Sequence, residues 1–143
     1  IVVDFGTATV FDAISIEGEY LGGAIAPGLG VSAESLYAAT SQLRRVELVA
    51  PPAAIGKNTA HSIQSGLLFG YTGLVEHMVK LYKQEMDSPN ATVIATGGLA
   101  PIIAERTDIF THVNEELTLQ GLQLVFELNR EPYSRTDTAG SDS

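Results

Sequence analysis

The first 25 residues show the spacing of apolar side chains that is typical of short strands. Segments 1–5, 9–16 and 19–25 are rich in β-branched and aromatic residues, which suit a half-buried pleated surface. Between the second and third segments, Glu17-Gly18-Glu19 predicts a hairpin turn in which Gly18 takes a positive φ. The pattern therefore predicts three consecutive antiparallel strands.

The middle of the chain changes to a helical period. A helix is expected over residues 28–39, after Pro27, and residues 40–58 are expected to form a long irregular connection. The strongest helix begins with a cap at Asn58 or Thr59 and extends to about Glu85. Its apolar positions are spaced by three or four residues, on one helix face: Ile63, Leu67, Tyr71, Leu74, Met78 and Tyr82.

The last third alternates strands and helices. A short strand is expected over residues 91–96, and Gly97-Gly98 turns the chain into a helix with Pro101 in its first turn. An edge strand over residues 109–113 and a helix over residues 118–129 follow.

The expected order of elements predicts an α/β protein. Three antiparallel strands are followed by alternating helices and strands, which indicates a mixed sheet of the ribonuclease H-like type. We expect residues 1–130 to form one such lobe. Residues 131–143 are expected to be disordered, because the chain has no large apolar residue from Ser134 onward.

Composition and charge narrow the function classes. The chain has 143 residues, 45% of them apolar, so a packed core is expected. Its formal net charge of −9, with 17 acidic and 8 basic side chains, disfavours nucleic acid or an anionic membrane as a partner. The absence of cysteine excludes disulfides and thiolate metal sites. A bound polyphosphate would therefore contact backbone amides, hydroxyls and a metal ion.

The clearest chemical motif lies at the end of the first expected strand. Asp4, Gly6, Thr7 and Thr9 combine a carboxylate with a tight turn that offers amides and hydroxyls. Such a turn can bind phosphate oxygens while the carboxylate binds a cation. The triplet "DFG" also occurs in protein kinases, but the other kinase motifs are missing from this chain. From the residues alone, an ordinary hairpin with polar turn residues stays open as the alternative.

Other glycine-rich segments are less specific. "GKNT" at residues 56–59 resembles the end of a P-loop, but the earlier glycine of that motif is replaced by Pro51, so a P-loop is excluded. Thr59 then suits either a ligand contact or a plain helix cap. The turn at Gly97 and Gly98 suits either a nucleotide contact or a simple connection.

Taken together, "DFGTATVFD", "GGAIAPGL", "GKNT" with "SIQSGLLFG", and "ATGGLA" resemble the type III pantothenate kinases. That family belongs to the superfamily of acetate and sugar kinases, heat-shock ATPases and actin. The resemblance covers roughly residues 1–130, and it implies an enzyme that transfers phosphate from ATP to pantothenate and forms 4′-phosphopantothenate in coenzyme A synthesis.

The resemblance also implies roles for individual residues. Asp4 matches a ligand of a monovalent cation, potassium or ammonium, and Thr7 matches a contact to ATP phosphate. Thr59 matches a pantothenate contact, and Gly97 and Gly98 match the adenosine turn. ATP and magnesium are the implied cofactors, and the implied location is the cytoplasm.

Members of this family have two lobes, and this chain resembles the C-terminal one. The catalytic aspartate belongs to a G-x-D-R motif of the first lobe, which does not occur in this sequence. We therefore expect no catalytic residue here, and no activity from this chain without the N-terminal lobe. The alternative is a non-catalytic regulatory module, an accessory transcription factor with the same fold.

Assembly is a further expectation. Gly66, Gly70 and Gly73 lie on one stripe of the long helix, where each glycine costs roughly 1 kcal/mol relative to alanine. Close approach by another backbone would explain them. Because family members are homodimers, we expect this helix to pack across a twofold axis; the alternative is that the glycines pack against the domain's own sheet.

Overall fold

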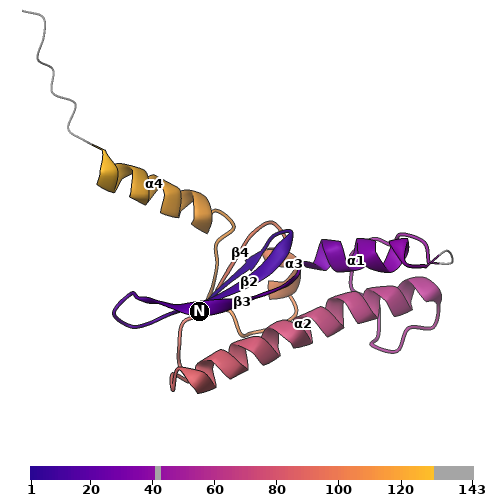
Figure 1. Cartoon of the computed structure of the whole chain (residues 1–143). Helices are drawn as coiled ribbons and strands as arrows, with labels where there is room; N and C mark the ends of the chain where they lie inside the picture. The colour runs from indigo at the N-terminus through magenta and orange to yellow at the C-terminus, as the bar shows by residue number, and fades with distance from the viewer. Residues whose placement is uncertain (41–42, 131–143) are drawn as a thin grey trace, which may run out of the picture.

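The computed structural model describes residues 1–40 and 43–130, and within these residues five strands form one mixed sheet (Figure 1). The sheet order is β3-β2-β1-β4-β5. β1 and β2 pair antiparallel, as do β2 and β3, whereas β4 pairs parallel with both β1 and β5. The strands are β1 (Val2–Phe5), β2 (Ala8–Ile14), β3 (Tyr20–Pro27), β4 (Ile94–Thr96) and β5 (His112–Val113).

Four helices complete the described part of the chain. They are α1 (Leu29–Ala38), α2 (Thr59–Glu85), α3 (Ala100–Ala104) and α4 (Leu117–Asn129). The predicted order of elements is therefore confirmed for these residues, as a mixed α/β structure. The tail predicted over residues 131–143 lies outside the described residues.

The hairpin between β2 and β3 forms as predicted. Gly18 takes a φ of 86°, and the Ser15 hydroxyl oxygen accepts hydrogen bonds from the backbone amides of Glu17 and Glu19. The two later strands are shorter than predicted. The Val93 amide donates to the side-chain oxygen of Thr111, so regular pairing of β4 with β5 begins only at Ile94 and His112.

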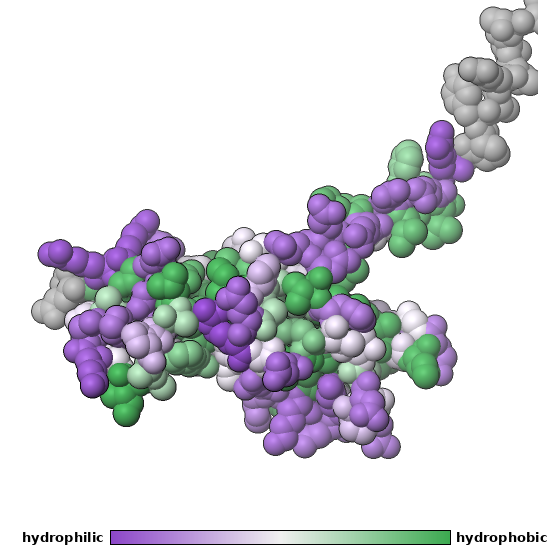
Figure 2. Space-filling view, turned by 180° about the vertical axis from the view of Figure 1, so that it is seen from behind, coloured by the Kyte–Doolittle hydropathy of each residue, from purple (hydrophilic) through white to green (hydrophobic). Residues whose placement is uncertain are grey.

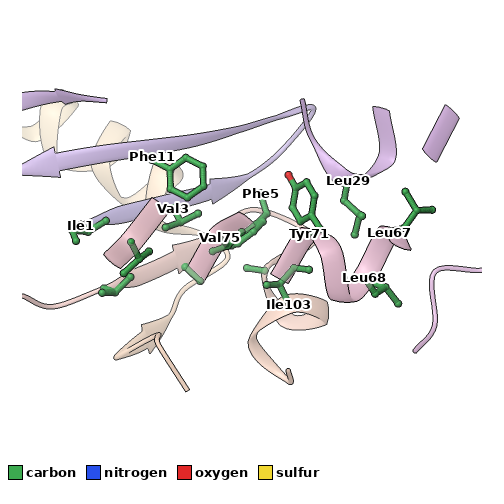
Figure 3. Close-up of a cluster of buried hydrophobic side chains, with 14 of the residues drawn as sticks. Ile1, Val3, Phe5, Phe11, Leu29, Leu67, Leu68, Tyr71, Val75 and Ile103 are labelled. Carbon is green, nitrogen blue, oxygen red and sulfur yellow. The ribbon is translucent and has the colours of Figure 1, made fainter. Parts of the chain in front are cut away.

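The core lies between the sheet and α2 (Figure 3). Asn58 caps α2, because its side-chain oxygen accepts a hydrogen bond from the His61 amide at 2.8 Å. The side chains that meet in the core include Val3, Phe5 and Phe11 from the strands and Leu68, Tyr71, Val75 and Val79 from α2.

One position of the predicted apolar stripe is wrong. Leu74 is 37% exposed, whereas Val75 is fully buried. Both residues are apolar, so the sequence periodicity alone could not choose between them. Continuing from Tyr71 in steps of four reaches Val75 and Val79, and these two residues face the sheet.

The glycine stripe of α2 lies on the outer face of the helix. A Cβ atom added at Gly66, Gly70 or Gly73 would meet nothing within 4 Å. The alternative that these glycines pack against the domain's own sheet is therefore wrong.

Helix α4 extends away from the sheet (Figure 1). It forms where a helix was predicted, but none of its residues is buried. Its apolar side chains gather on the protruding helix (Figure 2) and are between 57% and 84% exposed: Leu119, Leu122, Leu124, Val125, Phe126 and Leu128. No helix within the described ranges has the length and apolar character needed to cross a membrane.

Candidate functional site

The turn between β1 and β2 is held by backbone hydrogen bonds. The Gly6 amide donates to the Ala8 carbonyl oxygen at 3.1 Å, and the Gly28 amide donates to the Thr7 carbonyl oxygen at 3.1 Å. Thr7 itself is exposed, and its hydroxyl makes no side-chain hydrogen bond within the described part of the protein. Backbone hydrogen bonds therefore hold the turn, while the exposed Thr7 side chain is available to a ligand.

Gly28 brings the start of α1 against this turn. A Cβ atom at Gly28 would lie 2.3 Å from the Thr7 carbonyl oxygen and 2.5 Å from that of Gly6. No other residue fits without moving the backbone. The glycine therefore allows the two segments to touch.

A second glycine closes the other side of the site. β1 and β4 pair in parallel with Asp4 opposite Thr96, so the turn that follows β4 lies beside the end of β1. Gly97 has a φ of +88°, and a Cβ atom there would lie 2.5 Å from an Asp4 carboxylate oxygen and 2.8 Å from the Phe5 nitrogen. A Cβ atom added at Gly98 would meet nothing within 4 Å, so packing does not require glycine at that position.

The structure thus brings Asp4, Gly6, Thr7 and Gly97 together at one end of the sheet. The described residues contain no group of three or more His, Cys, Asp or Glu side chains suited to a metal ion, so Asp4 belongs to no such cluster. The hydroxyl and carbonyl oxygens of the surrounding turns could supply further, neutral ligands to a cation bound by Asp4.

Thr9 has a different environment from the rest of the turn. It is fully buried, and its hydroxyl hydrogen-bonds the hydroxyl of Tyr71 on α2. Tyr71 donates its single hydroxyl hydrogen to the Pro27 carbonyl oxygen at 3.2 Å, so Thr9 must donate to Tyr71. Thr9 therefore anchors the turn to α2 from the core side, and it is not among the residues that we propose as ligands.

The sequence pattern predicts Tyr71 only as a core residue, yet in the structure it connects α2 with the turn and with the end of β3. Figure 3 shows its ring rising from α2 with the hydroxyl directed toward the strands. Burial of that hydroxyl raises the pKa of Tyr71 above its ordinary value, and the hydrogen bond from Thr9 opposes the increase. The signal in the sequence is a hydroxyl-bearing ring within an apolar stripe, and it occurs at Tyr82 as well as at Tyr71.

Thr59 lies apart from this group. It begins α2, twelve residues before Tyr71, which corresponds to roughly 18 Å along the helix. Its side chain borders an apolar hollow of about 320 Å³ together with Leu36, Leu43 and Leu67. The larger hollows, of about 530 to 540 Å³, lie elsewhere and are not lined by any of the predicted site residues. An open edge with two backbone turns, rather than a deep cavity, forms the candidate site.

Comparison with known proteins decides the family. The family described as type III pantothenate kinase matches residues 1–81, which is more than half of the chain. The chain belongs to the type III pantothenate kinase family.

Curated relatives that carry the name type III pantothenate kinase match across most of this chain. The protein from Roseiflexus sp. (strain RS-1) is 53% identical over 130 residues, which cover 91% of this chain and 51% of the relative. The protein from Desulfatibacillum aliphaticivorans is 54% identical over 128 residues, which cover 89% of this chain and 49% of the relative. The chain therefore spans about half the length of these pantothenate kinases.

A solved structure shares the fold. It comes from Campylobacter jejuni and is described as a conserved Baf family transcriptional activator. It matches with a TM-score of 0.66 and 22% identity over 90% of this chain and 57% of that one. At this identity the likeness shows the fold alone, so the roles of Asp4, Thr7, Thr59, Gly97 and Gly98 stay predictions for a pantothenate kinase of this type.

Proposed function

We propose that this chain forms the nucleotide-binding lobe of a kinase that phosphorylates pantothenate to 4′-phosphopantothenate, the first step of coenzyme A synthesis. Membership of the type III pantothenate kinase family supports the reaction. Because the chain spans about half the length of its curated relatives, the activity is proposed for a protein of their full length, acting in the cytoplasm.

The observation that carries this proposal is the pair of turns around Asp4. Backbone at Gly97 lies so close to the carboxylate that a Cβ atom does not fit, and the exposed Thr7 turn lies on the neighbouring strand connection. Close backbone approach with a free hydroxyl and a carboxylate suits a polyphosphate and the cation that accompanies it. The strand order, with three antiparallel strands followed by parallel ones, further supports a ribonuclease H-like lobe of the actin-like ATPase type.

In this proposal the residues bind and orient rather than transfer protons. ATP with magnesium supplies the phosphoryl group and offsets its charge. The Thr7 hydroxyl and the amides of its turn position the phosphates, and Asp4 binds a potassium or ammonium ion beside them. Gly97 and Gly98 let backbone lie next to the adenosine, and Thr59 contacts pantothenate. We assign no catalytic base to this chain.

The outer face of α2 supports a homodimer as part of the same proposal. The three glycines have no neighbour at the Cβ position, and apolar Phe69, Leu74 and Leu81 are 36% to 41% exposed on this helix. A second copy packed across the glycine stripe would cover them. Glycines permit closer approach of two helix backbones than leucines do.

The reaction is tested with the full-length parent enzyme and labelled pantothenate. We expect 4′-phosphopantothenate to form with ATP and magnesium, and its rate to rise as potassium replaces a large organic cation at constant ionic strength. Asp4→Asn should abolish or strongly reduce that stimulation, whereas Asp87→Asn, at the far end of α2, should leave it intact. Equal activity of the Asp4 variant across the potassium titration would refute the cation role, and absence of product from the parent would refute the function.

A further inference from the structure

The hydroxyl of Thr96 is buried and has no partner. Thr96 is 2% exposed, and its side-chain oxygen makes no hydrogen bond within the described residues. Buried hydroxyls in folded proteins almost always have a partner, and an exception calls for an ion, a water or a ligand that completes it. This hydroxyl is therefore a candidate ligand atom.

The sheet places this hydroxyl beside Asp4. The parallel register pairs Asp4 with Thr96, so the two side chains lie on the same face of neighbouring strands, whose backbones are about 4.8 Å apart. That face is opposite the one that α2 covers, since Val3 and Ala95, the preceding pair, are fully buried in the core on the α2 side. The two oxygen-bearing side chains are thus adjacent but not hydrogen-bonded to each other.

The backbone gives a second, independent observation at the same place. Gly97 follows Thr96 directly, and a Cβ atom at Gly97 would lie 2.5 Å from an Asp4 carboxylate oxygen. The turn that directly follows Thr96 is therefore folded closely around the Asp4 carboxylate. A bridging group between the two side chains would satisfy the hydroxyl and offset the charge of Asp4.

The available charge indicates what that group is. Asp4 supplies one negative charge, and the described residues contain no group of three or more acidic, histidine or cysteine side chains that could hold a metal ion. One carboxylate with neutral oxygens suits a weakly charged cation that prefers oxygen, rather than zinc or calcium, which take more anionic or nitrogen ligands. We propose that the Thr96 hydroxyl oxygen is the second protein ligand, with Asp4, of the monovalent cation; this inference rests on the proposed function.

The test measures how potassium stabilises the full chain. Melting temperature is followed while potassium chloride replaces N-methylglucamine chloride at constant ionic strength, and the half-saturating potassium concentration is compared between variants. Thr96→Val removes the hydroxyl and keeps the shape, Thr96→Ser keeps the hydroxyl, and Thr72→Val removes a buried threonine hydroxyl elsewhere, on α2. Thr96→Ala provides a second hydroxyl-free variant should the valine variant fold poorly.

We expect the wild-type melting temperature to rise with potassium. Thr96→Val should raise the half-saturating concentration about tenfold or more, while Thr96→Ser and Thr72→Val stay near wild type. Without potassium, Thr96→Val should melt at the wild-type temperature or higher, because the unpaired hydroxyl is gone. A merely structural threonine would instead lower melting at every potassium concentration.

Three outcomes would overturn the inference. If Asp4→Asn removes the potassium effect and Thr96→Val retains it, the cation site stands without Thr96. If the wild-type chain shows no potassium effect, both the inference and the proposed cation site fail. If Thr96→Val weakens binding of magnesium-ADP equally with and without potassium, the hydroxyl serves the nucleotide and not the cation.

Discussion

The support of the phosphate turn by α2 leads to a prediction for Tyr71→Phe. The substitution keeps the buried ring and removes the hydroxyl, which donates to the Pro27 carbonyl at 3.2 Å and accepts from Thr9. Tyr71 is 7% exposed and Thr9 is fully buried, so water cannot readily replace the lost partner of Thr9.

The expected loss follows from the groups that are left unpaired. A typical hydrogen bond contributes about 1 kcal/mol net, and a buried group left without its partner costs about 1–3 kcal/mol. We therefore expect Tyr71→Phe to lower the free energy of unfolding by about 1–3 kcal/mol. Thr9→Val in the Tyr71→Phe background should recover part of that loss, because both partners are then apolar.

Urea unfolding of the four proteins in this double-mutant cycle, followed by circular dichroism, gives the coupling energy. Tyr82→Phe is a matched control, since its hydroxyl donates to the Phe11 carbonyl at 3.2 Å, away from the turn. The control should also lose stability but show no coupling with Thr9→Val. Additive effects of Tyr71→Phe and Thr9→Val would show that the two hydroxyls do not stabilise each other.

The remaining predictions concern pH, glycines and α4. Burial raises the pKa of Tyr71 in the folded state. The stability that the neutral Tyr71 side chain contributes is therefore present below the ordinary tyrosine pKa of about 10, and it is lost as the pH rises above that value. Tyr71→Phe should flatten this decline in free energy of unfolding, measured by urea titrations over a series of pH values. Gly97→Ala should lower the melting temperature and weaken ADP binding, because position 97 has a φ of +88° and an added Cβ atom would lie 2.5 Å from an Asp4 carboxylate oxygen. Gly98→Ala should change the melting temperature little, because a Cβ atom there meets nothing within 4 Å. Equal effects in the two variants would show that close packing at Gly97 is not what requires glycine. Gly70→Leu should give a folded monomer by light scattering if α2 forms the dimer interface, and a dimer of unchanged size would rule that interface out. A chain that ends after Glu116 should keep its stability to within about 0.5 kcal/mol, because α4 buries no residue, and a large loss in urea titration would show that α4 contributes to the fold.

The sequence predicted the elements better than their contacts. Strand and helix types follow from local periodicity, and the hairpin at Gly18 follows from the conformational freedom of glycine. The choice between Leu74 and Val75 on α2 could not be predicted, because it depends on how the helix lies against the sheet. The lack of buried residues in α4 likewise depends on tertiary packing. The spacing of its apolar side chains predicts a helix that packs against another surface, but it does not say where that surface lies.

For the candidate site, too, the sequence predicted individual residues but not how they lie relative to one another. Asp4, Thr7 and Gly97 could be proposed from motifs, but their proximity required the parallel register of β1 with β4. The inward orientation of Thr9 follows from strand alternation, once the pairing is known, and the sequence motif alone made it look equivalent to Thr7. The unpaired hydroxyl of Thr96 had no signal in the sequence, because it depends on which groups lie around it.

The proposed function depends on the binding of ATP phosphates by the Thr7 turn. The most direct measurement is isothermal titration of magnesium-ATP into the full-length parent in potassium buffer, comparing wild type with Thr7→Val and with Thr118→Val on the exposed helix α4 as the control. Loss of a hydrogen bond to a charged group costs about 1.5–3 kcal/mol, so Thr7→Val should weaken ATP binding by roughly 10- to 100-fold, while Thr118→Val leaves it unchanged. If Thr7→Val binds ATP as tightly as the wild type does, the Thr7 hydroxyl does not bind the phosphates.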